Sequence, residues 1–243
     1  MRIVSPTGRK LSFNNKKVEY ESPFLVLNNF DNISDNISIS KKGPDIEIKN
    51  VVCNIENSNV FNNENCLKMS NYNSNINGCK SVKSISILSD KIYTLETYYS
   101  NYSGGYSSDA YTEIGISSLR FEASHFTNKY RIQIGYKNSN NYILYNGANY
   151  FGMDSGAYYF TIPVSLSTPL HFAAVIKDDY AYIFGNGVLY VKASIKRNDS
   201  NDYIVFNREK YPAYIAVNFI SIRIGDFSNN LQSFTVPTKK YSL

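Results

Sequence analysis

Few residues of this 243-residue chain have the types and spacing that catalysis needs. Two carboxylates separated by one residue occur at Glu19 and Glu21, and again at Asp45 and Glu47. Alternate residues of a strand point to one face, so the members of such a pair would face the same way. Retaining glycosidases use two carboxyl groups about 5 Å apart. We expect both pairs to lie on solvated faces and give them no catalytic role.

The sequence also gives no support for a nucleophilic active site or a zinc site. The two histidines, His125 and His171, have no Gly-x-Ser-x-Gly sequence to place a serine nucleophile beside them, and His171 is expected to be structural. Cys53, Cys66 and Cys79 form no Cys-x-x-Cys pair and have no histidine nearby, so no zinc site is predicted. We therefore predict no catalytic residue, no metal site and a chain that is not an enzyme.

Calcium is the one cation that the sequence leaves open. Asp178, Asp179 and Asn186 offer oxygen ligands in two successive turns. Successive turns of a β-meander lie at opposite ends of its strands, whereas calcium takes six to eight oxygen ligands at one place. The sequence supports no such ligand set, and we predict no cofactor.

Two segments rich in Tyr, Ser, Gly and Asn have the composition of recognition surfaces. Residues 98–111 read YYSNYSGGYSSDAY, and residues 140–159 read NNYILYNGANYFGMDSGAYY. Tyrosine supplies rigid amphipathic contact area, and the small polar residues supply adaptable hydrogen bonds. The alternative is that Tyr and Asn are abundant throughout a chain whose residue usage indicates an A/T-rich genome. The predicted ligand-binding residues are Tyr98, Tyr99, Tyr102, Tyr106, Asp109, Tyr145, Asn146, Tyr150 and Asp154.

Charge is concentrated at the beginning of the chain. The net charge is +5, and residues 1–18 carry five cations and no acid. We predict that residues 1–19 form a basic arm that anchors the chain to an acidic partner surface; the alternative is a solvated terminus. The arm has no interleaved aromatic residues, so specific nucleic-acid binding is not expected. The predicted anchoring residues are Arg2, Arg9, Lys10, Lys16 and Lys17.

Short apolar runs separated by turn residues predict an all-β fold. The clearest case is a three-strand meander of Phe172–Ile176, Ala181–Phe184 and Val188–Ala193, turning at Asp178-Asp179 and Asn186-Gly187. Residues 234–241 are expected to close a sheet edge. No run approaches the roughly 20 apolar residues that span a bilayer, so membrane insertion is not expected. The other predicted strands are Phe24–Leu27, Ile37–Ile39, Ile46–Ile48, Val51–Ile55, Ile85–Leu88, Tyr93–Tyr99, Glu113–Ile116, Arg120–Ala123, Tyr130–Tyr136, Tyr142–Tyr145, Tyr158–Ile162, Tyr203–Phe206 and Ala213–Ile224.

Several of these strands resemble those of laminin-G-like, or concanavalin A-like, jelly-roll domains. The similar stretches are Tyr93–Tyr99, Tyr130–Gly135, His171 with Phe172–Val175, and Ile222–Gly225. The resemblance implies a two-sheet antiparallel β-sandwich, one jelly roll over residues 20–243, of a kind that often binds sugars. The catalytic branch of that superfamily carries Glu-x-Asp-x-Glu on one strand, and this chain has no such motif.

No secretory signal is visible in the sequence, so a glycan-binding protein of this kind would need another route out of the cell, such as release by lysis. Because concanavalin A-like modules occur in phage fibres and head decorations, we expect a place in a bacteriophage particle. We expect a non-enzymatic virion protein, in a head decoration or a head or tail fibre, whose domain adheres to host surface glycans. The arm would bind other virion proteins, and a homo-oligomer is left open. Two alternatives remain: a glycoside hydrolase or lyase on the same fold, and a purely architectural capsid or tail protein.

Overall fold

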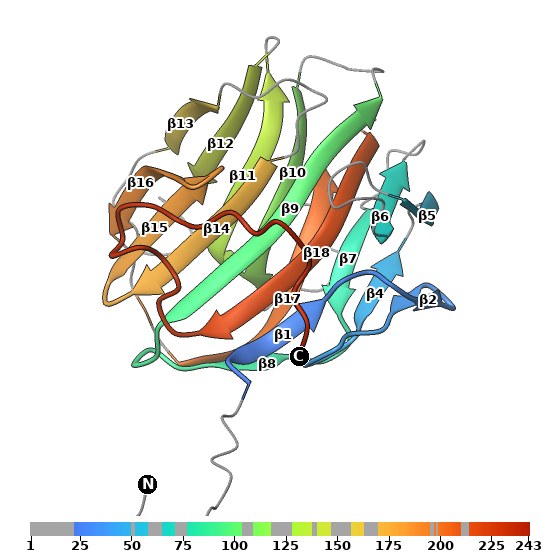
Figure 1. The fold of residues 1–243 in the computed structure, drawn as a ribbon, viewed down its shortest axis with the longest axis horizontal. Coiled ribbons are helices and arrows are strands. Elements are labelled where there is room, and N and C mark those ends of the chain that lie inside the picture. Colours follow the sequence, from blue (N-terminus) through green and yellow to red (C-terminus); the bar gives the residue numbers. More distant parts are fainter. Residues whose placement is uncertain are drawn as a thin grey trace, which may run out of the picture.

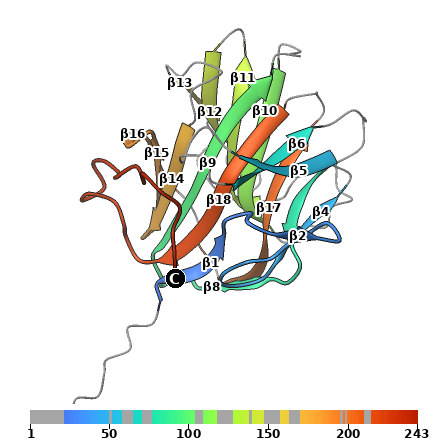
Figure 2. The same cartoon turned by 45° about the vertical axis from the view of Figure 1, so that its right-hand side comes forward.

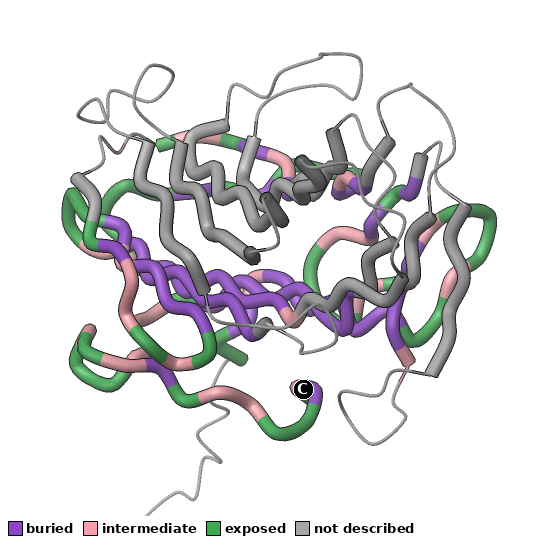
Figure 3. The backbone as a smooth tube through the Cα atoms, turned by 90° about the horizontal axis from the view of Figure 1, so that it is seen from above, coloured by how far each residue is buried: buried purple, intermediate pink, exposed green. Residues whose placement is uncertain are grey.

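The structure is a computed structural model, and its described residues form antiparallel strands and no helix. Two sheets pack face to face, and a final segment forms a third layer outside one of them (Figures 1 and 3). The predicted all-β, two-sheet antiparallel sandwich is therefore confirmed. The described residues are 22–49, 52–57, 65–70, 77–103, 109–117, 128–137, 140–146, 157–162, 170–194, 197, 199–209 and 214–243.

The first sheet, sheet A, has eight strands, and β1 pairs with β18 at its side. Its strands in spatial order are β16 (Val188–Ser194), β15 (Tyr180–Gly185), β14 (Leu170–Lys177), β9 (Tyr93–Ser103), β18 (Tyr214–Ile224), β6 (Asn65–Ser70) and β5 (Val52–Asn57), with β1 (Phe24–Asn28) beside β18.

The second sheet, sheet B, has ten strands, and β8 pairs with β17 off the main path. Its strands in spatial order are β13 (Ala157–Ile162), β12 (Asn140–Asn146), β11 (Asn128–Lys137), β10 (Asp109–Ser117), β17 (Ser200–Glu209), β7 (Asn77–Ser81), β4 (Ile46–Lys49), β3 (Ile37–Ser38) and β2 (Ile33–Ser34), with β8 (Ile85–Ile87) beside β17.

The main core lies between the two sheets. Leu95, Phe172 and Ile222 of sheet A point inward and pack in one cluster with Ile204 and Ile48 of sheet B. All five are almost fully buried. Because side chains alternate along a strand, the residues between these apolar positions belong to the outer face of sheet A. The outer face of sheet A carries the polar residues of the candidate site described below.

The predicted central meander is confirmed as β14, β15 and β16. The Asn186-Gly187 turn has positive φ at both residues, 46° and 83°, as a two-residue hairpin turn requires. Asn186 also accepts a hydrogen bond at Oδ1 from the His171 backbone N–H, at 2.8 Å. This turn therefore fixes both the hairpin and the start of β14.

Replacing Gly187 with Ala is expected to lower the free energy of unfolding by about 2 kcal/mol, because a side chain at positive φ is strained. The new Cβ would also lie 2.7 Å from the Phe234 carbonyl oxygen. Urea denaturation of the variant and wild type measures the difference. Asp178→Gly is the matched control: its φ is 51° and its side chain is exposed, so we expect a change under about 0.5 kcal/mol. An equal effect of the two substitutions would contradict this account.

Residues 226–243, which we call the strap, correct the prediction that residues 234–241 close a sheet edge. The strap contains only isolated bridges, Val188 with Ser233 and Asn229 with Ser233. It runs from the end of β18 across the outer face of sheet A and ends near β1, on the side away from sheet B (Figures 1 and 2). Phe234 is buried against the sheet, Phe227 and Leu231 are half-buried, and Pro237 has no backbone N–H to donate to a ladder.

Several strand boundaries also differ from prediction. β6 and β7 were not predicted, because their sequences NCLKMS and NGCKS lack apolar alternation and are instead organised by their neighbours. β9 continues to Ser103 and β10 begins at Asp109, so most of the segment 98–111 is strand and not a loop. The predicted strand Arg120–Ala123 and the basic arm, residues 1–19, lie outside the described residues.

Candidate functional site around Glu96

The outer face of sheet A carries a polar row in the middle of three apolar strands. Glu96 of β9 is paired in register with Ala173 of β14 on one side and with Ser221 of β18 on the other. Directly opposed residues of antiparallel strands share a face, so these three side chains point outward together. The strand alternation places Thr94 and Tyr98 on the same face.

Glu96 is a buried carboxylate with three donor groups around it. Its exposed fraction is 2% and that of His171 is 0%. His171 Nε2 lies 3.0 Å from Glu96 Oε1, and the Tyr241 hydroxyl donates to the same oxygen at 2.8 Å. The Arg223 guanidinium donates to Glu96 Oε2. We call these four residues the Glu96 cluster; it draws on β9, β14, β18 and the strap.

The strap residue Tyr241 covers the cluster. Its ring lies 5.4 Å from the Phe219 ring and 4.8 Å from the Arg223 guanidinium carbon. Burial, and next the negative charge of Glu96, raise the pKa of Tyr241 well above the ordinary value for a phenol. Tyr241 is therefore a protonated donor to Glu96 at neutral pH.

Tyr98 forms the open margin of the cluster. Its side chain is half-buried, and its ring lies 5.5 Å from the His171 ring and 6.4 Å from the Phe219 ring. Burial raises the pKa of Tyr98. Tyr98 is thus a partly exposed aromatic side chain beside the buried charged residues.

Polar contacts fasten the far end of the strap to the loop after β1. Lys240 Nζ donates to the Asn29 carbonyl oxygen at 2.6 Å and lies 3.1 Å from Asp31 Oδ1. Asn29 Nδ2 in turn donates to the Tyr241 carbonyl oxygen at 2.9 Å. Burial raises the pKa of Asp31, but Lys41 and Lys240 together outweigh it, so the pKa is lowered overall. The ionised form of Asp31 is the one that holds the strap.

The contribution of Asp31 to stability is expected to disappear in acid. A carboxyl group with a lowered pKa stabilises the fold above its ordinary pKa, and that contribution is lost as pH falls through the folded-state value, below about 4. At neutral pH, Asp31→Asn should lower the free energy of unfolding by under about 1 kcal/mol, because the group is 42% exposed. Urea denaturation at a series of pH values measures this; a deficit that persists unchanged at pH about 2 would contradict it.

The cluster is arranged for acid–base chemistry around one carboxylate. A Ser-His-Glu nucleophilic triad is not assembled, because Ser221 on β18 and His171 on β14 have β9 between them, about 10 Å across two strand spacings. A two-carboxylate hydrolase site is not formed by the described residues of the cluster either, since Glu96 is its only acid. The arrangement that the cluster does provide is one carboxylate, Glu96, beside the Arg223 guanidinium and the His171 imidazole.

Several buried polar atoms near Glu96 have no hydrogen-bond partner among the described residues. They include Ser221 Oγ, His171 Nδ1 and Arg223 Nε; both side-chain polar atoms of Asn218, three residues before Ser221 on β18, are also without a partner. Asn218 lies at the bulge of β18, beside Phe219. Buried polar groups are nearly always paired, so such a concentration at one place suits a polar ligand.

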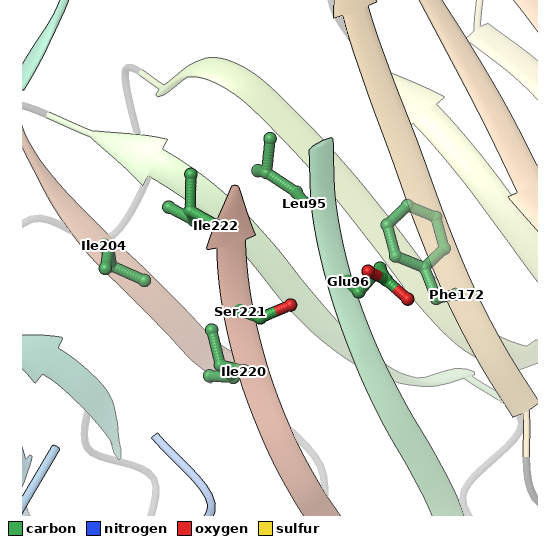
Figure 4. Close-up of a pocket in the computed structure, with 7 residues that line it drawn as sticks. All are labelled: Leu95, Glu96, Phe172, Ile204, Ile220, Ser221 and Ile222. Carbon is green, nitrogen blue, oxygen red and sulfur yellow. The ribbon is translucent and has the colours of Figure 1, made fainter. Parts of the chain in front are cut away.

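The cavity beside this row is on the other side of the sheet. It lies between Leu95, Phe172 and Ile222 of sheet A and Ile204 of sheet B, with Glu96 at its margin (Figure 4). Its volume is about 10 Å³, the lower limit for a single water molecule. A sugar would not fit there, so the outer face is the candidate site.

The structure separates the residues predicted to bind a ligand. Tyr98, Tyr99 and Tyr102 lie on β9 in sheet A, whereas Asp109 is on β10 and Tyr145 and Asn146 are on β12, both in sheet B. Of these, only Tyr98 has a described side chain, and it borders the Glu96 cluster. The other predicted residues, Tyr106, Tyr150 and Asp154, lie outside the described residues.

Sequence reasoning missed Glu96, Arg223 and Tyr241. A signal was present: Glu96 and Arg223 each stand inside an apolar strand, in Thr-Leu-Glu-Thr and Ile-Arg-Ile. A charged residue inside a buried strand needs a partner of opposite charge, and the two could have been paired on that ground. Nothing in the sequence pointed to Tyr241, because its place depends on the path of the strap.

No metal or membrane feature was found in the described part of the chain. Within it, no group of three or more His, Cys, Asp or Glu side chains is arranged to hold a metal ion. The same residues contain no helix of the length and hydropathy that crosses a bilayer.

Comparison with known proteins finds solved structures with a similar fold. No protein-family model and no curated protein sequence matches the chain. Similar solved structures include the carbohydrate esterase of the Shiga toxin-encoding bacteriophage phi24B, with a TM-score of 0.58, 6% identity, and 74% of this chain and 90% of that one covered. The globular domain of Trypanosoma cruzi calreticulin has a TM-score of 0.54 at 9% identity, with 84% and 89% covered. Trypanosoma rangeli sialidase has a TM-score of 0.53 at 9% identity, with 90% and 31% covered.

These likenesses support the jelly-roll sandwich and correct one prediction. A carbohydrate esterase has a similar fold over 90% of its length, and a sialidase over only 31% of its length. The prediction that the chain is not an enzyme is therefore wrong: it rested on the missing Glu-x-Asp-x-Glu motif and the missing Gly-x-Ser-x-Gly sequence, which exclude only particular kinds of active site. A fold positions residues, and the chemistry depends on which residues it positions.

Proposed function

We propose that this chain is a carbohydrate-active enzyme, a glycoside hydrolase or lyase, whose reacting centre is formed by Glu96, His171 and Arg223. The observation that carries the proposal is a buried carboxylate on the outer face of sheet A, held by His171, Arg223 and Tyr241. The similarity in fold to a carbohydrate esterase and a sialidase supports the substrate class. The half-buried Tyr98 offers an aromatic ring beside the centre, against which a sugar ring can pack.

The single carboxylate of the cluster favours elimination over hydrolysis. In elimination from a uronic acid, a base removes the proton next to the carboxyl group, and the electron pair forms a carbon–carbon double bond. The glycosidic oxygen leaves and takes a proton from an acid. Arg223 would bind the substrate carboxylate, Glu96 would accept the proton and His171 would supply one. Two-carboxylate hydrolysis would need a second acid at this place.

The test is turnover of uronic-acid polysaccharides by wild type and by Glu96→Gln. We expect unsaturated sugar products from wild type and a fall in rate of about 100-fold or more in the variant. Glu47→Gln is the matched control, since Glu47 is exposed on β4, and its rate should be unchanged. Equal rates of wild type and Glu96→Gln, with both proteins folded, would remove Glu96 from the reaction.

A place on a bacteriophage particle is a second proposal with its own support. One similar structure comes from a bacteriophage, and the basic residues of positions 1–18 suit an acidic anchoring surface. Imaging of purified particles labelled with an antibody to this chain tests it. Labelling at one fixed position is expected, and unlabelled particles would overturn the proposal.

A further inference from the structure

The strap occupies the part of the Glu96 site that a sugar would fill. Tyr241 lies against Phe219 and Arg223, which flank Ser221 at alternate positions of β18. Its hydroxyl donates to Glu96, the residue opposite Ser221 in register. The Tyr241 ring meets Phe219 edge-on, at an interplanar angle of 77°, and its hydroxyl is bound to a carboxylate. A saccharide at this place would contact the same aromatic side chain and the same carboxylate.

The two halves of the strap are held in different ways. Phe234 is buried in an apolar cluster with Ala173, Val175 and Phe184, and its N–H donates to the Gly187 carbonyl oxygen at 2.9 Å. The second half is held by Lys240 and Tyr241, through polar contacts and through an edge-on contact of the Tyr241 ring with Phe219 and a tilted one with Phe24. The first half thus belongs to a buried apolar cluster, whereas the polar contacts of the second half are ones that water can replace.

A hinge joins the two halves. Residues 235–239 are exposed or half-buried, and in the described part of the chain they make no backbone–backbone hydrogen bond. Rotation there would lift Lys240 and Tyr241 without disturbing Phe234. Segments with few buried contacts open at the lowest free energy.

We infer that residues 240–243 are a displaceable cap that closes the Glu96 site, with Tyr241 in the position of a substrate sugar. This inference rests on the proposed function and adds regulation of the same site: the cap must lift before a glycan reaches Glu96. The unpaired Ser221 Oγ, opposite Glu96 in register, then becomes a hydrogen-bonding group for a sugar hydroxyl. The expected ligand is a saccharide, which would compete with the Tyr241 side chain for the position beside Glu96.

Accessibility of position 221 tests the cap without any measure of turnover. Ser221→Cys changes one atom of a buried side chain that has no hydrogen-bond partner among the described residues. Alkylation of this cysteine by iodoacetamide is followed by mass spectrometry of the peptide that contains it. The rate is compared between Ser221→Cys alone and the same chain with Lys240→Ala and Tyr241→Ala added.

We expect alkylation to be at least about tenfold faster when both strap contacts are removed, since each is a hydrogen bond that involves a charged group. Ser242→Ala is the matched control, an exposed neighbour in the same segment, and should leave the rate unchanged. Lys240→Ala alone serves as the milder variant, with a smaller increase in rate. Thermal melting establishes that each protein is folded.

The outcomes separate this inference from the proposed function. Equal alkylation rates with and without the strap substitutions, in folded proteins, would overturn the cap. Faster alkylation with no polysaccharide turnover would keep the cap and overturn the enzyme. Faster alkylation together with faster turnover in the Lys240→Ala, Tyr241→Ala chain, in its Ser221 form, supports both.

Discussion

Replacing Glu96 with Ala is expected to lower the free energy of unfolding by about 3–5 kcal/mol, the effect of breaking a buried ion pair from one side. The variant leaves the buried Arg223 and His171 and the half-buried Tyr241 without their shared acceptor. Arg223 would keep its ring contacts, with Phe227 3.8 Å and Tyr241 4.8 Å from the guanidinium carbon. Urea denaturation followed by circular dichroism measures the difference.

The matched control for Glu96→Ala is Glu47→Ala, on the exposed side of β4. Its effect should be within about 0.5 kcal/mol, as for most surface substitutions. Glu96→Gln should lose less than Glu96→Ala, because the amide oxygen still accepts one of the hydrogen bonds. A loss below about 1 kcal/mol for Glu96→Ala would contradict the account of the cluster as a tightly paired centre.

Replacing Phe234 with Ala is expected to destabilise the protein by about 3–5 kcal/mol, the usual range for a buried phenylalanine. The ring is 5% exposed and lies 5.6 Å from the Phe184 ring and 5.5 Å from the His171 ring. Its loss would open a cavity between the strap and sheet A. The difference is measured by urea denaturation of the variant beside wild type.

Thr235→Ala is the matched control for Phe234→Ala, because it is the next residue and is exposed. We expect a change of under about 0.5 kcal/mol. Similar losses for the two variants would show that the strap adds no packing to the core. The distinction between a fixed first half and a displaceable second half would then fail as well.

The parts of the fold that the sequence predicts well are those set by local chemistry. The strands β14, β15 and β16 follow from apolar runs and from a turn in which Asn186 and Gly187 both tolerate positive φ. β6 and β7 escape prediction because their order comes from pairing with β18 and β17, far away in sequence. The same holds for the strap, whose path depends on Phe234 and Tyr241 finding one face of sheet A.

The candidate site was harder to predict than the fold. Its four members come from positions 96, 171, 223 and 241, and no two of them are close in sequence. Composition favours the two Tyr-rich segments as ligand-binding sites. Among the described side chains of those segments, Tyr98 alone borders the Glu96 cluster. Glu96 and Arg223 can be predicted only by asking which residue neutralises a charge inside an apolar strand.

Turnover by the chain with an opened cap tests the central claim most directly. Wild type, the Lys240→Ala, Tyr241→Ala chain and Glu96→Gln are incubated with a panel of uronic-acid and neutral polysaccharides. Unsaturated products and new reducing ends are measured together. The account predicts products from wild type, more from the opened chain and at most traces from Glu96→Gln. No product from either wild type or the opened chain, with both folded, would contradict a carbohydrate-active centre at Glu96.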